Sequence, residues 1–146
     1  MKQTALAMLA RRDHSRAELK AKLLAKGFDS VDADMAMDYC ESMGYLDDDR
    51  YAQMLLQSHI SRGHGPAKVK QAFMQKGIPA ELSNTVMNHC DCDWYQLARD
   101  KAQRKFGAAG KLEHKEKARR VRYLMGQGFN YDQVAHALEY DPYTDD

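Results

Sequence analysis

The chain has 146 residues, of which 44% are hydrophobic and 29% charged, and its formal net charge is +1. This length suits one ordinary domain or a small array, and the composition is that of a folded protein. No apolar run approaches the roughly 20 residues that cross a bilayer. The N-terminus becomes charged too early for a signal peptide, so we expect a cytoplasmic protein with no membrane contact.

The first third of the chain, residues 1–46, carries start and stop signals for three helices. Ser15 and Glu18 have the spacing of a capping box, which opens a helix. The expected segments are a short helix over 4–10, a helix from Ser15 to Gly27 carrying Leu19, Leu23 and Leu24, and a helix from Asp29 or Ser30 to about Gly44 carrying Val31, Met35 and Tyr39.

Residues 47–92 repeat this pattern. The acidic run from Asp47 to Asp49 favours a helix start, and Pro66 suits a first helical position because its missing N–H would be unpaired there anyway. Gly63, Gly65 and Gly77 are stop signals. The apolar faces are Tyr51, Ala52, Leu55, Leu56 and Ile60 in the first helix and Val69, Phe73 and Met74 in the second. The expected helices are 48–62, 66–76 and 79–90.

Residues 93–146 predict three more helices, over 93–106, 113–126 and 130–139, followed by a short acidic tail. Asn130 and Gln133 form another capping box. A loose connector, from Gly107 to Lys111, separates the first two helices. No segment has the period-two alternation of a half-buried strand.

An internal repeat underlies this pattern. Two apolar residues precede Gly27, Gly77 and Gly128 by three and four positions, and these glycines are 50 and 51 residues apart. We therefore predict an all-α fold, a tandem array of three three-helix repeats (1–46, 47–92 and 93–146) forming an elongated, curved body. A compact helical bundle is the main alternative.

Charge is distributed unevenly along the chain. Residues 27–49 hold eight acids and no Lys or Arg, whereas residues 99–122 hold ten bases against three acids. Such separation favours a protein that meets a polyanion with its basic part and a cationic or mixed protein surface with its acidic part.

The bases of the last repeat are the main candidate binding residues. Lys115, Arg119 and Arg122 share one helical face, which would bind phosphates without reading base sequence. The alternative is a face that contacts only water. Trp94, Tyr95 and Tyr123 can stack on bases, but their helical spacing is more typical of core residues. The candidate residues are Lys68, Lys70, Lys76, Arg104, Lys105, Lys111, Lys115, Arg119 and Arg122.

Catalytic and metal-binding patterns are weak. Six scattered histidines, among them His64 in a turn between two glycines, show no triad spacing, and no phosphate-binding glycine loop is present. The segment from His89 to Cys92 lacks the second ligand pair of a zinc site, and three cysteines fit reduced thiols. Asp47 to Asp49 could bind a divalent cation, but capping explains them more simply. We expect no enzyme, cofactor or metal.

The stretch GYLDDDRYA, followed by SRGHGP, a helix and KGI, resembles the signature of the RecX family, bacterial regulators of the RecA recombinase. Several fixed spacings make this resemblance specific. The matching residues are Gly44, Tyr45, Leu46, Asp47, Asp48, Arg50, Tyr51, Ala52, Gly63, Gly65, Pro66 and Gly77.

The resemblance implies a tandem three-helix array that binds the RecA filament and inhibits its recombinase, ATPase and co-protease activities, in DNA repair, recombination and the SOS response. We expect a monomer whose partners are RecA and, through phosphates, single- or double-stranded DNA. Arg50 and Arg62 are equally suited to partner contacts and to structural ion pairs. The alternatives are a free-standing DNA-binding protein with a helix-turn-helix-like module, and a protein scaffold whose bases contact nothing.

Overall fold

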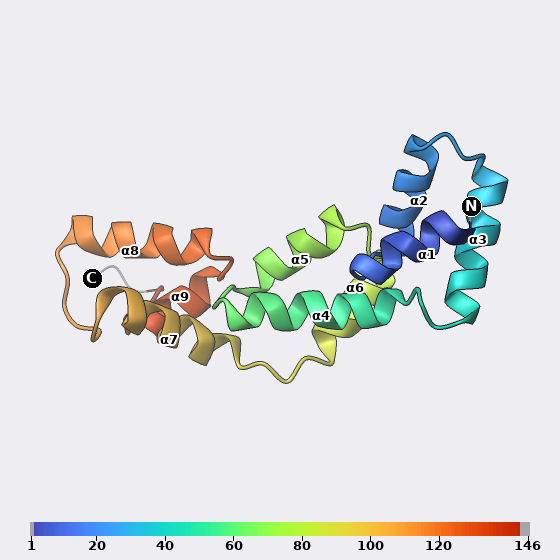
Figure 1. Cartoon of the computed structure of the whole chain (residues 1–146). Helices are drawn as coiled ribbons and strands as arrows, with labels where there is room; N and C mark the ends of the chain where they lie inside the picture. Colours follow the sequence, from blue (N-terminus) through green and yellow to red (C-terminus); the bar gives the residue numbers. More distant parts are fainter. Residues whose placement is uncertain (1, 144–146) are drawn as a thin grey trace. The chain divides into compact units, whose positions relative to one another are not determined.

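The computed structural model describes residues 2–143, and this part of the chain is all-helical (Figure 1). No strand occurs among these residues, and none of their helices is long and apolar enough to cross a membrane. The tail predicted after the last helix extends into residues 144–146, outside the described residues. The helices are α1 (Lys2–Arg11), α2 (Arg16–Ala25), α3 (Ser30–Ser42), α4 (Asp48–Ser61), α5 (Pro66–Gln75), α6 (Ala80–Asn88), α7 (Trp94–Phe106), α8 (His114–Gly126) and α9 (Tyr131–Leu138).

The helix starts follow the predicted caps. Ser15 accepts a hydrogen bond from the Glu18 N–H while the Glu18 side chain accepts one from the Ser15 N–H, and Asn130 forms the same capping box with Gln133. The Asp47 carboxylate accepts the Arg50 N–H over 3.1 Å. These bonds satisfy N–H groups that have no partner inside the helix, so they fix where each helix begins.

Equivalent helix stops confirm the internal repeat. Gly27, Gly77 and Gly128 have φ values of +93°, +74° and +102°, a conformation that side chains with a Cβ disfavour. In each case the following residue donates its N–H to the carbonyl five positions earlier, which is the Schellman pattern. The three bonds are Phe28 to Leu23 (3.2 Å), Ile78 to Phe73 (2.9 Å) and Phe129 to Leu124 (3.3 Å).

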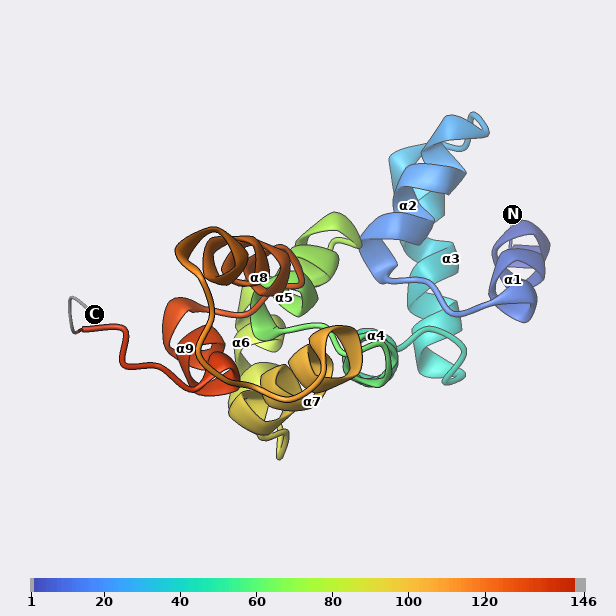
Figure 2. The ribbon, with the colours of Figure 1, turned by 90° about the vertical axis from the view of Figure 1, so that its left-hand side faces the viewer.

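The chain divides into two compact units. Unit 1 comprises residues 1–55 and 72–88, and unit 2 comprises residues 56–71 and 89–146. In Figure 2 helices α2 and α3 of unit 1 lie side by side, as do α7 and α9 of unit 2. The core of unit 1 includes Ala5, Leu19, Leu23, Ala33, Ala36, Met37, Cys40 and Leu46, and that of unit 2 includes Ala98, Ala102, Leu124, Phe129, Val134, Ala137 and Leu138.

Equivalent turns meet in each unit, through different donor groups. In unit 1 the Ser15 hydroxyl donates to the carbonyl of Lys76, and in unit 2 the Gly65 N–H donates to the carbonyl of Gln127 over 2.8 Å. Each acceptor immediately precedes a repeat glycine. A Cβ built on Gly128 would lie 2.8 Å from the Lys68 nitrogen, so the backbones approach too closely for a side chain.

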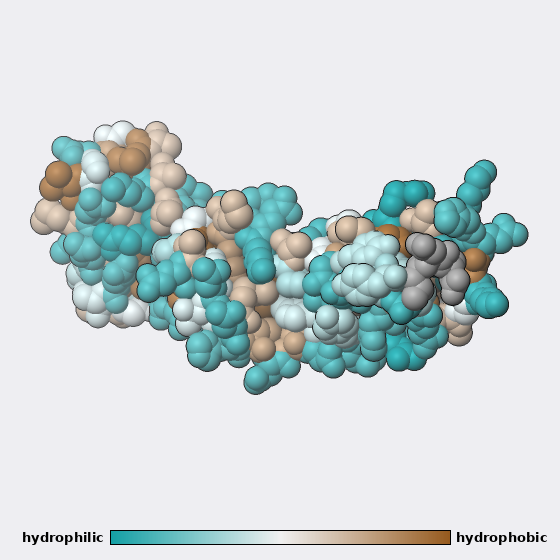
Figure 3. Space-filling view, turned by 180° about the vertical axis from the view of Figure 1, so that it is seen from behind, coloured by the Kyte–Doolittle hydropathy of each residue, from teal (hydrophilic) through white to brown (hydrophobic). Residues whose placement is uncertain are grey.

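Some predicted apolar faces are wrong. Val69 and Phe73 are fully buried, but Met74 is 80% exposed, because consecutive helical residues point about 100° apart and only one narrow stripe of α5 is covered. Val31 and Met35 are 65% and 64% exposed, and Leu24 is 41% exposed. Figure 3 shows hydrophobic side chains at the surface of the α1–α3 part of unit 1.

Candidate functional site

The signature residues at the start of α4 make contacts within unit 1. The Asp48 carboxylate accepts a hydrogen bond from the Arg16 N–H over 2.7 Å. The Arg50 guanidinium donates a hydrogen bond to the Gly44 carbonyl over 2.8 Å and forms an ion pair with Asp13 over 2.9 Å. The Tyr51 hydroxyl lies 3.4 Å from an Arg12 nitrogen. This part of the signature therefore joins the α1–α2 turn to α4, and Arg50 forms a structural ion pair while its side chain stays 45% exposed.

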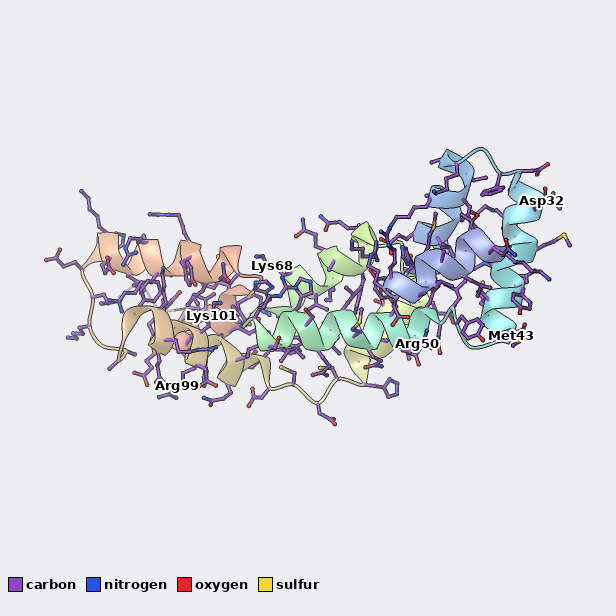
Figure 4. The ribbon with its side chains drawn as sticks, in the orientation of Figure 1. Asp32, Met43, Arg50, Lys68, Arg99 and Lys101 are labelled. Atoms are coloured by element: carbon purple, nitrogen blue, oxygen red, sulfur yellow. The ribbon has the colours of Figure 1, made fainter. Side chains whose placement is uncertain are left out.

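A surface pocket of about 470 Å³ lies beside Arg50 in unit 1. Apolar and polar groups both line it, and the Arg50–Asp13 ion pair contributes its charged edge. Met43, which is 51% exposed, directly follows α3 at the end near Arg50 (Figure 4). The other lining residues are Leu6, Leu9, Ala10, Tyr39, Gly44 and Tyr45.

The acidic stretch is partly neutralised by α2. Arg16 reaches both Asp38 (2.8 Å) and Glu41 (2.7 Å), and Lys20 pairs with Asp34 over 3.1 Å. Asp32, labelled in Figure 4, makes no ion pair with the residues that the structure describes. The net negative charge that residues 27–49 present at the surface of unit 1 is therefore smaller than their sequence alone suggests, because bases of α2 offset part of it.

Only part of the basic run is neutralised. Glu116 accepts both Arg119 (2.6 Å) and Arg120 (2.9 Å), and these hydrogen bonds lower the pKa of Glu116 to about 2. Arg99 pairs with Glu139 over 2.8 Å, and it points away from Lys101 (Figure 4). Arg119 is thus less available to a phosphate than its helical position suggests.

Four bases gather around the turn that joins α4 to α5. The Lys101 Nζ donates to the Arg62 carbonyl over 2.8 Å, and Lys68 lies at the same end of α4 (Figure 4). A Cβ built on Gly63 would lie 3.3 Å from the Lys101 Nζ and 3.4 Å from an Arg104 nitrogen, so both cations rest against this glycine. We call Arg62, Lys68, Lys101 and Arg104 the turn cluster. Across residues 2–143 none of the four forms an ion pair.

The other candidates lie elsewhere. Lys115 and Arg122 are exposed on α8 with no ion-pair partner in the described chain. Lys111 lines a pocket of about 680 Å³. Lys105 lies over the Tyr123 ring, 5.2 Å from its centre. Lys70 is exposed on α5.

Lys76 does not belong with these bases. It lies in unit 1, where its ammonium is 3.8 Å from the Glu18 carboxylate. Conversely, Lys101 is absent from the candidate residues although it is central to the turn cluster. Lys101 lies within the basic run, and this position marked it as a possible binding residue. The sequence alone does not show which residues of that run meet residues 62–68.

The aromatic candidates are divided between core and surface. Tyr123 packs edge-on against Phe106 with 5.4 Å between ring centres and contributes to the core of unit 2, as predicted. Trp94 is half-buried. Tyr95 is 43% exposed and contacts the His136 ring.

Cys90 and Cys92 lie in the connection between α6 and α7. The Cys92 N–H donates to the Cys90 sulfur over 3.3 Å. Burial, followed by the influence of Cys90, raises the pKa of Cys92 to about 11, so this thiol stays protonated at neutral pH. Within residues 2–143 no group of three or more His, Cys, Asp or Glu residues could hold a metal ion.

Family models match three consecutive parts of the chain. They are the first three-helix domain of RecX over residues 2–40, the second over 47–87 and the third over 91–138. The chain belongs to the RecX family. The boundaries 1–46, 47–92 and 93–146 stay predictions, but the tandem order of three RecX three-helix domains is established.

Relatives in the RecX family cover most of the chain. It is 38% identical over 137 residues to the regulatory protein RecX of Vibrio vulnificus, covering 94% of this chain and 90% of the relative. The RecX of Shewanella oneidensis is 42% identical over 123 residues, covering 75% and 97%. The crystal structure of RecX from Lactobacillus salivarius has the same fold, with a TM-score of 0.79, 16% identity, and coverage of 94% and 92%.

Proposed function

We propose that this protein binds the filament of the RecA recombinase on DNA and restrains its recombinase, ATPase and co-protease activities. The observation that carries the proposal is membership of a family of regulatory proteins across all three three-helix domains. The restraint of RecA is what the resemblance to RecX implies.

Unpaired positive charge in unit 2 supports a contact with phosphates. The turn cluster and exposed α8 bases such as Lys115 and Arg122 present donors that have no carboxylate partner among residues 2–143. Such groups bind the phosphates of a nucleic acid regardless of its base sequence. Their affinity falls as the salt concentration rises, because binding releases counterions.

Apolar and acidic groups in unit 1 support a contact with protein. Val31 and Met35 are exposed one helical turn apart on α3, and Asp32 lies between them in sequence without an ion pair within the described chain. Exposed apolar side chains bordered by charge are typical of protein contacts. We propose that α3 contributes to the contact with RecA.

Binding to a preformed RecA filament, to bare single-stranded DNA and to duplex DNA, each across a salt series, separates the candidate functions. We expect the protein to bind the filament more tightly than bare DNA and to lower its ATPase rate. Tight, sequence-specific binding to duplex DNA without RecA would instead favour the helix-turn-helix alternative. No binding to any of the three would leave the scaffold alternative.

A further inference from the structure

Two imidazoles lie against each other beside the turn cluster. The Nδ1 atoms of His59 and His64 are 2.8 Å apart, and the ring centres are 5.1 Å apart. One ring therefore donates its Nδ1 hydrogen to the other. Neither Nε2 atom has a hydrogen-bond partner within the described part of the chain. The pair thus presents two ring nitrogens to a further ligand.

The positive charges of Arg62, Lys68 and Lys101 act on this pair. Arg62 directly follows α4, Lys68 is on α5, and Lys101 and Arg104 reach the α4–α5 turn from α7. Burial, followed by the charges of Lys68 and the other imidazole, lowers the pKa of His64 to about 4. Burial and the charges of Arg62 and Lys68 lower the pKa of His59 as well.

The arrangement suits an anion and opposes a metal cation. Lys68 and Lys101 are half-buried, and burial followed by Arg104 and Lys68 lowers the pKa of Lys101. Since no carboxylate pairs with the turn cluster among residues 2–143, its mutual repulsion is uncompensated within the described chain. An oxyanion with several acceptor atoms would relieve this repulsion and accept hydrogen bonds from these N–H groups.

We propose that the imidazole pair and the turn cluster form a binding site for a phosphate group. Its oxygens accept hydrogen bonds from the guanidinium of Arg104, the ammonium groups of Lys68 and Lys101, and a protonated imidazole. One added proton leaves the bond between the histidines intact, because the cationic ring donates its Nδ1 hydrogen to the neutral ring.

Phosphate binding at this site is linked to proton uptake. A bound anion favours the imidazolium form and so raises the pKa of the pair. By linkage, affinity is highest below the pKa of the free pair and falls as pH rises through the pKa of the bound pair. A rise of about one pKa unit corresponds to a tenfold difference in affinity between these limits.

The phosphate can come from a nucleic-acid backbone or from free phosphate. The first source rests on the proposed function, whereas the site itself rests only on the geometry of unit 2. Measurement on the full chain without RecA keeps the two apart: loss of filament binding would leave the phosphate site standing, and absence of phosphate binding would leave filament regulation standing.

The experiment follows the imidazole NMR signals of the full chain between about pH 4 and pH 8. Three samples at equal ionic strength contain sodium chloride, inorganic phosphate or an oligothymidylate. We expect phosphate, the oligonucleotide or both to raise the pKa of His59 or His64 by about one unit relative to chloride. A rise with only one of them identifies the source, and no rise with either overturns the proposal.

Matched variants show whether the turn cluster is responsible. In the double variant Lys68→Met with Lys101→Met, the imidazole pKa should rise without any ligand, because two opposing charges are gone, and the further rise caused by phosphate should shrink. His114→Gln, which removes an exposed imidazole on α8, should leave the signals of the pair unchanged. An undiminished rise in the double variant, with far-UV circular dichroism unchanged, would also overturn the site.

Discussion

Phe73 is a fully buried aromatic side chain, and its neighbour Met74 is 80% exposed. We expect Phe73→Ala to lower the free energy of unfolding by about 3 to 5 kcal/mol, because it removes buried apolar surface and leaves a cavity. Urea unfolding measures this loss. Met74→Ala is the matched control and should change stability by less than about 1 kcal/mol. Equal losses in the two variants would mean that α5 buries a different face.

Histidines held neutral make stability depend on pH. His14 is 3% exposed, with its Nδ1 3.1 Å from the Arg12 carbonyl and its Nε2 3.0 Å from the Lys22 ammonium. Burial, followed by the charge of Arg12, lowers the pKa of His14, and the pKa of His64 is lowered to about 4.

The folded and unfolded states bind different numbers of protons in mildly acidic solution. Below the pKa of an unfolded histidine, about 6.5, the unfolded chain takes up protons that the folded chain does not. We therefore expect stability to be constant above this pH and to fall as pH drops toward 4. Urea midpoints across this range test it. His14→Gln should flatten part of the slope, and an unchanged slope would show that His14 titrates normally.

The contact between the α4–α5 turn and the α8–α9 turn depends on Gly65. A Cβ built there would lie 2.4 Å from the Gly128 carbonyl carbon, so a side chain must push the α4–α5 turn away from the α8–α9 turn. We expect Gly65→Ala to cost about 1 to 3 kcal/mol of stability by overpacking, measured by thermal or urea unfolding. Gly110→Ala, which meets nothing within 4 Å, should be nearly neutral.

Element-level signals were the most predictable part of the fold. Ser15, Asp47 and Asn130 begin helices, and the repeat glycines end them, because a cap or a left-handed turn depends on atoms only a few residues apart. Such short-range signals do not predict which faces of α3 and α5 are exposed. A single apolar position does not show which side of its helix a neighbouring helix will cover.

For the whole molecule, the distribution of charge should govern binding to the filament or DNA. We expect Lys115→Glu with Arg122→Glu to weaken binding and to lower the slope of log affinity against log salt by about one per lost phosphate contact. The measurement is a salt series, with circular dichroism to check helicity. Arg119 is left unchanged because Glu116 already engages it.

The control for this pair is Arg11→Glu with Lys26→Glu, which changes the net charge equally. Both residues are exposed in unit 1, outside the basic run. Binding and salt slope should stay near those of the unmodified protein. Equal weakening by both pairs would indicate a general effect of net charge, and unchanged binding in both would remove α8 from the interface.

The helices, the fifty-residue repeat and the family could all be predicted from the amino-acid sequence alone. These features depend on short-range hydrogen bonds, helical periodicity and signature spacing. Three-dimensional packing was needed to show that Arg50 pairs with Asp13, that Lys76 pairs with Glu18, and that Lys101 meets the α4–α5 turn. Electrostatic contacts depend on distance through space, and residues 62 and 101 become neighbours only when their helices pack.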